Sequence, residues 1–302
     1  MDSQLAVPQL HCTTALRTQL GEGPIWVAER EALYFVDIVN KNLHRLRPRH
    51  NALKTWATPL RPVFVVPTDA GSLLVGMEDG LYFFDETEGD FTCIQPIPMA
   101  DGDRTRLNDA CVDAEGRLWF GTMDEEEKEG KGILFCFKAV PGGYAVSQHD
   151  DDFIVTNGPS VTSDGRTLYV SDTPRGVIYR HSLSPDGALS DKTVFAKFDD
   201  GEGGPDGVVC DADGNLWASS WGGSKIIVFR PDGSRRLELS VPSPNMTKVA
   251  FTGPKLSTVY ATSARQNLSE ESLAQYPEAG GLFSGETPFR GIETRLFRCL
   301  AA

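Results

Sequence analysis

Four polar residues, each a carboxylate or an amide, recur at nearly the same phase of a repeated sequence pattern. Each lies 10 or 11 residues before an apolar segment: Glu22 before Leu33, Asn108 before Leu118, Asn157 before Leu168 and Asp206 before Leu216. Asn or Asp followed by Gly, as in Asn157-Gly158 and Asp206-Gly207, is often only a turn. A turn role does not require the same phase in four copies, however, so the pattern favours side chains that meet at one place.

Carboxylates that converge repel one another unless a cation offsets their charge. Two of the four residues are carboxylates, and together with one amide oxygen they form an all-oxygen set of three ligands. Such a set suits Ca²⁺, Mg²⁺ or Mn²⁺ and is tolerable for Zn²⁺ or Fe²⁺. With only three protein ligands, positions stay open for water and substrate, as in catalytic metal sites. The pattern therefore predicts one divalent ion with a catalytic role.

The elements that position these residues are predicted to be hairpins. The apolar segments begin at Leu33, Leu73, Leu118, Leu168, Leu216 and Val259, at spacings of 40, 45, 50, 48 and 43 residues. A turn precedes each segment, and a third and usually a fourth strand follow it. The sequence thus predicts an all-β fold, a six-bladed β-propeller with four antiparallel strands per blade, as one domain over residues 1–302. We expect a strand at 12–18 to close the last blade, and one short helix at 269–275.

Composition excludes several classes of partner. Asp and Glu outnumber Lys and Arg by 42 to 29, giving a net charge of -13, which repels nucleic acid and anionic lipid. No segment is apolar enough to span a membrane, and the N-terminus lacks the pattern of a signal peptide. The six cysteines are scattered without a C-x-x-C pair. We expect reduced thiols in a cytoplasmic protein; the oligomeric state is not predicted.

Several motifs carry a resemblance to a known family: Leu20-Gly-Glu-Gly-Pro-Ile-Trp26, Arg106-Leu-Asn-Asp109, Gly116-Arg-Leu-Trp-Phe-Gly-Thr-Met123, Asn157-Gly158 and Pro205-Asp-Gly207. In this order along nearly the whole chain, they resemble the SMP-30/gluconolactonase/regucalcin family. The resemblance implies a six-bladed propeller that hydrolyses sugar lactones with one divalent ion (Ca, Mn, Fe(II), Zn or Mg). Segments near the C-terminus, such as 245–248 and 262–265, resemble bacterial xylono-, arabinono- and glucono-type lactonases. The chain departs from many members at Ala110 and Pro159.

The resemblance also implies roles for individual residues. The metal ligands are Glu22, Asn157 and Asp206, with Asp206 as the candidate general base. Substrate contacts fall on Arg106 and Asn108, with Asp109 beside them, and more loosely on Glu126.

Alternatives remain for three of the predicted site residues. Arg106 could pair with a site carboxylate, and Glu126 belongs to an acidic run, 124–129, of a kind that is usually solvated. Lys248, 11 residues before Val259, suits either a substrate contact or charge balance for the acids. The glycine-rich stretch 201–204 is interpreted as a flexible approach to Asp206.

Two other functions stay open. One is a non-catalytic, metal-binding regulatory propeller, and the other is a broader esterase. The latter would need a more apolar pocket than Arg106 and Asn108 suggest. Neither a Ser-His-Asp triad nor a histidine metal site can be assembled from the positions of the five histidines.

Overall fold

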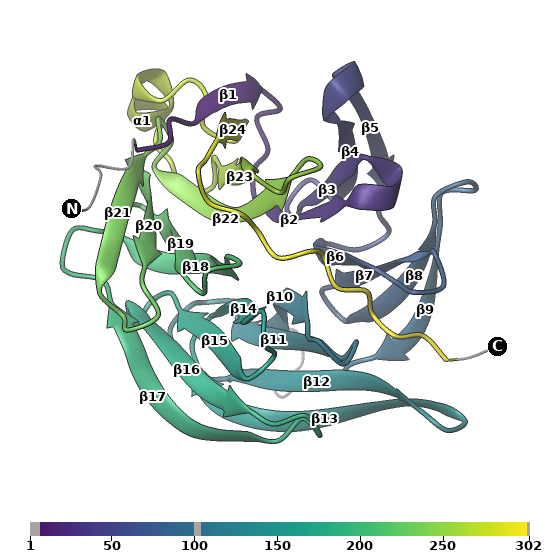
Figure 1. The fold of residues 1–302 in the computed structure, drawn as a ribbon. Coiled ribbons are helices and arrows are strands. Elements are labelled where there is room, and N and C mark those ends of the chain that lie inside the picture. The colour runs from purple at the N-terminus through teal and green to yellow at the C-terminus, as the bar shows by residue number, and fades with distance from the viewer. Residues whose placement is uncertain (1–6, 100–103, 301–302) are drawn as a thin grey trace.

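The computed structural model describes residues 7–99 and 104–300, which fold into β-sheets arranged around a central axis (Figure 1). Residues 1–6, on which the expected lack of a signal peptide partly depends, lie outside this described part. Within the described ranges, no helix is long and apolar enough to cross a membrane. All six cysteines are free thiols, as the sequence predicts.

Four of the sheets contain four antiparallel strands each. The first is β2 (Gly21–Val27), β3 (Ala32–Asp37), β4 (Asn42–Arg47) and β5 (Ala52–Ala57). The second is β6 (Pro62–Pro67), β7 (Leu73–Met77), β8 (Gly80–Asp85) and β9 (Asp90–Pro96). The third is β10 (Thr105–Val112), β11 (Leu118–Asp124), β12 (Gly132–Val140) and β13 (Gly143–Phe153). The fourth is β14 (Thr156–Val161), β15 (Thr167–Asp172), β16 (Val177–Leu183) and β17 (Leu189–Lys197).

The remaining strands form one continuous sheet of eight. Its members are β1 (His11–Thr14), β18 (Gly204–Cys210), β19 (Leu216–Trp221), β20 (Lys225–Phe229), β21 (Arg235–Ser240), β22 (Asn245–Thr252), β23 (Thr258–Ala264) and β24 (Leu282–Glu286). Trp221 of β19 pairs with Asn245 of β22, and this pairing joins the two halves of the sheet. The prediction of six separate four-stranded blades is therefore wrong: the described residues form four such blades and one eight-stranded sheet in a propeller-like fold. The repeat spacing counts hairpins, but it does not show where sheets join.

The ends of the chain and the short helices largely agree with expectation. Strand β1 pairs antiparallel with β24, although it spans His11–Thr14 rather than 12–18. Helix α1 (Glu270–Gln275) begins after Ser269, whose side chain accepts a hydrogen bond from the Ser272 amide. Two 3-10 turns, η1 (Ala28–Arg30) and η2 (Pro48–His50), connect strands of the first sheet.

The second strand of each hairpin is buried on both faces, because neighbouring sheets pack against it. This burial explains why these strands are nearly continuous apolar runs rather than alternating ones. Trp119 and Trp217, which occupy the same repeat position, are completely buried. Past β24, residues 287–300 cross the end of the ring, and Gly291 there forms a bridge with Asp211 (Figure 1).

The strands nearest the axis position the candidate site. These strands, β2, β6, β10, β14, β18 and β22, contact one another in this order, and β22 contacts β2. Each has an irregular register with its partner strand, for example between Glu22 and Ile25 in β2 and between Asn157 and Ser160 in β14. Such bulges bend a strand and re-aim the side chains beside them. The polar residues of the sequence pattern lie at or beside these irregularities.

Candidate functional site

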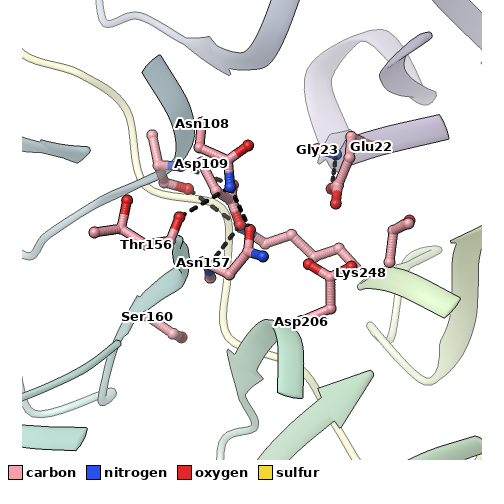
Figure 2. Close-up of polar contacts among 12 residues, drawn as sticks. Glu22, Gly23, Asn108, Asp109, Thr156, Asn157, Ser160, Asp206 and Lys248 are labelled. Carbon is pink, nitrogen blue, oxygen red and sulfur yellow. Dashed lines mark hydrogen bonds and ion pairs between the residues drawn. The ribbon is translucent and has the colours of Figure 1, made fainter. Parts of the chain in front are cut away.

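The side chains of Glu22, Asn157 and Asp206 point toward one central region from β2, β14 and β18 (Figure 2). Asn108 and Asp109 reach the same region from β10, and Lys248 reaches it from β22. Each of the six is less than 9% exposed. The structure therefore brings together the polar residues that share a repeat phase, although as many as 226 positions separate them in the sequence.

The pKa values of Glu22 and Asp206, the two acids that face this region, are shifted upward. Glu22 Oε2 accepts one hydrogen bond, from the Gly23 amide at 2.8 Å. Burial, and then the nearby Asp109 charge, raise the pKa of Glu22 to about 8. Burial and the charges of Glu22 and Asp109 likewise raise the pKa of Asp206 well above its usual value. The apo site thus disfavours two ionised carboxylates.

Asp206 also has an oxygen without a hydrogen-bond partner. Its Oδ1 atom is buried, and no described residue donates to it. Buried polar atoms in folded proteins nearly always have a partner, so this atom is suited to a ligand, an ion or a water. It is the clearest local sign that this region accommodates another group.

Asn157 is held from two sides. Its Nδ2 donates to Thr173 Oγ1 at 2.8 Å, and its Oδ1 accepts from Asn108 Nδ2 at 2.6 Å. Gly158 beside it has φ +53°, and a Cβ there would lie 2.1 Å from the Val208 amide nitrogen. Only glycine allows β14 to approach β18 so closely while adopting this backbone conformation.

Lys248 and Asp109 form a buried ion pair. Lys248 Nζ lies 2.7 Å from both carboxylate oxygens of Asp109 and 3.3 Å from the Ala110 carbonyl. Asp109 also accepts hydrogen bonds from the Ala110 and Gly158 amides. Both residues line a narrow cavity of about 150 Å³ that continues along the axis toward the C-terminal segment. This geometry favours charge balance for Lys248 over a substrate contact.

The structure places Glu125, rather than Glu126, beside Arg106. Arg106 Nη1 donates to Asn108 Oδ1 at 2.8 Å, and its Nε lies 3.6 Å from Glu125 Oε2. Glu125 also pairs with Arg61. Glu126 is exposed and pairs with Arg104, so it lies outside this group of contacts. Past Asp124, the last residue of β11, the acidic run is a loop, so strand periodicity could not single out Glu125.

Two aspartates that were not predicted from the sequence hold the strands entering the site. Asp37 accepts hydrogen bonds from the Gln19 and Leu20 amides, just before Glu22. Asp172 does the same for the Ile154 and Val155 amides, just before Asn157. The signal was present, since each lies four residues after the first Leu of its apolar segment, at Leu33 and Leu168.

The glycine-rich stretch before Asp206, predicted from the sequence to be a flexible approach, is joined to β20 and β21 through the Glu202 side chain. Lys225 Nζ donates to Glu202 Oε1 at 2.8 Å, and Arg235 donates to both oxygens of the Glu202 carboxylate. The Asp199 amide donates to the same carboxylate at 2.9 Å. These donors hold the pKa of Glu202 well below its usual range, with Arg235 as the largest cause.

The residues present fit a hard divalent ion. Two carboxylates and an amide oxygen supply neutralising charge and oxygen ligands, and the unpartnered Asp206 Oδ1 supplies an unused lone pair. Among the described residues, no group of three or more His, Cys, Asp or Glu side chains is arranged to hold a metal. Any ion here therefore depends on the Asn157 amide as well as on the acids.

Comparison with known proteins gives matches over most of the chain. A family model described as "SMP-30/Gluconolactonase/LRE-like region" matches residues 20–265. A 6-deoxy-6-sulfogluconolactonase of Pseudomonas putida is 32% identical over 289 residues, covering 95% of this chain and 98% of that protein. An L-arabinolactonase of Azospirillum brasilense is 33% identical over 290 residues, covering 93% of each. The crystal structure of a calcium-binding protein, regucalcin, from Agrobacterium tumefaciens has a TM-score of 0.90 at 26% identity, covering 98% of each chain.

Proposed function

This chain belongs to the SMP-30/gluconolactonase/LRE-like family, as its sequence motifs predict, and from this premise we propose that it is a metal-dependent hydrolase that opens a sugar lactone to the aldonic acid. Two relatives of similar length are a 6-deoxy-6-sulfogluconolactonase and an L-arabinolactonase by name. The observation that carries the proposal is the convergence of Glu22, Asn157 and Asp206 on one region, together with the unpartnered Oδ1 of Asp206.

In this proposal, Glu22, Asn157 and Asp206 hold the ion. A bound divalent ion supplies Lewis-acid activation of the lactone carbonyl and lowers the pKa of bound water. Asp206 is the general base that takes a proton from the attacking water. Water oxygen bonds to the carbonyl carbon, the ring C–O bond breaks, and the proton on Asp206 passes to the leaving ring oxygen. One water is consumed, and one hydroxy acid forms.

Substrate recognition is assigned to the polar groups beside the acids. Arg106 presents donors suited to ring hydroxyls, and Glu125 presents an acceptor next to it. Asn108 accepts a hydrogen bond from Arg106 through Oδ1, and both of its amide hydrogens are engaged by Thr156 and Asn157, so we assign it to orienting Arg106 beside the substrate. Asp109 and Lys248 satisfy each other, so we assign them to the floor of the site rather than to the sugar. Glu126 is not assigned a substrate contact, because its partners lie at the surface. The free cysteines favour a reducing compartment such as the cytoplasm.

A second candidate is a non-catalytic, metal-binding regulatory propeller. It is favoured by the structural match to a protein described as calcium-binding. Both candidates predict ion binding, but only the first predicts turnover.

The experiment is a lactonase screen of the purified protein after removal of metal by chelation. Pentono- and hexono-lactones are tested with no metal and with added Ca²⁺, Mg²⁺, Mn²⁺, Fe²⁺ or Zn²⁺. Metal-dependent hydrolysis of at least one lactone supports the proposal. Ion binding without hydrolysis of any lactone favours the regulatory candidate, and undiminished hydrolysis after full chelation rejects a metal-dependent mechanism.

A further inference from the structure

We propose that Ser171, near the end of β15, and Thr173, just past it, are positioning residues that fix the Asn157 amide and the Asp206 strand relative to each other. The inference rests on the ion site proposed above and assigns residues that touch neither the ion nor the substrate. Its basis is a chain of hydrogen bonds whose direction is set at both ends.

The chain begins at a group that can only donate. Arg106 Nη1 donates to Asn108 Oδ1 at 2.8 Å, so the Asn108 amide must turn its Nδ2 the other way. That nitrogen donates to the Thr156 carbonyl at 2.9 Å and to Asn157 Oδ1 at 2.6 Å. Its two hydrogens therefore serve two acceptors.

The chain ends at a group that can only accept. Thr173 Oγ1 donates its single hydrogen to the Pro205 carbonyl at 2.8 Å. The same oxygen can then only accept from Asn157, whose Nδ2 lies 2.8 Å away. The Asn157 amide is thus oriented from both sides, with its nitrogen toward Thr173 and its oxygen toward Asn108 and the central region.

Ser171 makes a second link between the two ligand-bearing strands. Its hydroxyl is completely buried, and it lies 2.7 Å from the Asp206 carbonyl and 3.3 Å from the Asn157 carbonyl. Thr173 binds Pro205, and Ser171 binds the next residue, Asp206. The Pro205 and Asp206 carbonyls of β18 therefore both accept hydrogen bonds from hydroxyls at the C-terminal end of β15.

Strand β18 approaches Thr173 so closely that no side chain fits between them at Gly204. A Cβ added to Gly204 would lie 2.5 Å from the Thr173 carbonyl and 2.9 Å from its Cγ2 atom. Between the two hydroxyl residues, Asp172 holds the backbone entering β14 through the Ile154 and Val155 amides. Three consecutive residues thus fix three parts of the framework around the site.

The test measures ion affinity directly in the stripped protein. Thr173→Val keeps the shape of the side chain but removes the hydroxyl, whereas Thr173→Ser keeps the hydroxyl. Mn²⁺ and Ca²⁺ are titrated into chelator-stripped wild type and variants by calorimetry. Loss of a residue that orients a metal ligand typically costs about 10- to 100-fold in metal affinity. We expect that loss for Thr173→Val and affinity near wild type for Thr173→Ser. Thr193→Val, which removes a surface hydroxyl bonded to Arg180, is the matched control and should leave affinity unchanged.

The outcomes separate this inference from the proposed function. Wild-type affinity in Thr173→Val overturns the positioning role while leaving the ion site intact. Absence of ion binding by the wild type overturns both. A double variant with Asn157→Ala provides an independent check: Thr173→Val should then cause a smaller loss than in the wild type, because only the bond from Thr173 to the Pro205 carbonyl remains to be removed. An equal loss in both backgrounds would show that Thr173 does not act through Asn157. If Thr173→Val does not fold, Ser171→Ala takes its place in the titration, and unchanged affinity in it contradicts the proposal.

Discussion

The two ends of strand β18 carry aspartates in opposite circumstances. Asp211, just past its last residue, has four donors: the Asp213 and Asn215 amides, Asn215 Nδ2 and Trp217 Nε1. Asp206, near its first residue, is equally buried, yet its Oδ1 has no donor among the described residues. A carboxylate that holds the fold is surrounded by donors, whereas one available for chemistry is left short of them.

Strand β10 repeats the arrangement in which an aspartate just past the strand accepts hydrogen bonds from four donors. Asp113, just past its last residue, accepts from the Glu115 and Arg117 amides, from Arg117 Nε at 2.6 Å and from Trp119 Nε1 at 2.8 Å. In both copies, an aspartate six residues before a buried tryptophan ties the turn to the core. The difference between the two ends of the strand therefore distinguishes structural acids from candidate reactive ones.

The largest expected effect is loss of activity in Asp206→Asn. This change keeps the shape of the side chain but removes the proposed base and one ligand charge. Removal of a general base typically costs 10²- to 10⁴-fold, and we expect kcat/KM for the best lactone to fall by about that much. Burial disfavours the ionised form of Asp206, so the stripped variant should be no less stable than the stripped wild type. Steady-state kinetics and urea unfolding check the two parts, and wild-type kcat/KM would remove Asp206 from the mechanism.

The next effect is loss of stability in Asp211→Ala. The change leaves the buried donors of Asn215 and Trp217 without their acceptor. Unsatisfied buried groups cost about 1 to 3 kcal/mol each, and we expect a total loss of about 2 to 4 kcal/mol in the free energy of unfolding. The kcat of the folded fraction should stay within about twofold of wild type. Urea unfolding measures the loss, and a loss under about 0.5 kcal/mol would show that saturation with donors does not mark a structural acid.

An effect of intermediate size is expected when metal is removed, and it distinguishes Asp206 from Asp211. An ion at 100 times its Kd adds about 2.7 kcal/mol to stability if it binds only the folded state. We expect that gain when Ca²⁺ or Mn²⁺ is restored to the stripped wild type, and again in the milder variant Asp211→Asn. Asp206→Asn should show little of it. Thermal unfolding with and without ion gives the comparison, and an equal gain in Asp206→Asn would place the ion elsewhere.

Much of the fold could be predicted because hairpins repeat. The spacing of apolar segments located the second strands, and the pairing of β1 with β24 followed from the need to cover an edge strand. The single bridge between Trp221 and Asn245 could not be predicted. Whether neighbouring sheets join depends on one backbone contact, and no residue type encodes it.

Residue type and phase predicted which strands carry the site but not which atoms would be satisfied. Glu22, Asn157 and Asp206 do come together, yet Lys248 is engaged by Asp109 and Glu126 lies at the surface. Residues 125–129 form a loop without strand periodicity, so the sequence could not distinguish Glu125 from Glu126. The roles of Ser171 and Thr173 were also hidden, because a hydroxyl's partners depend on how closely two strands approach.

The smallest expected effect concerns Glu202, four residues before Asp206 and as well supplied with donors as Asp211. Its pKa lies below the usual 4.5, so its ionised form stabilises the fold above that pH, and this contribution is lost as pH falls toward the folded-state pKa. Because the ion pairs are partly exposed and screened, Glu202→Gln should cost only about 1 to 2 kcal/mol at pH 7, and less at pH 3.5. Glu238→Gln, which removes a more exposed partner of Arg235, is the control and should cost less at both pH values. Urea unfolding at the two pH values measures the loss of unfolding free energy. A loss that grows as pH falls would contradict the expected pH dependence. No loss at pH 7 would show that an acid with four donors at this end of β18 does not stabilise the fold.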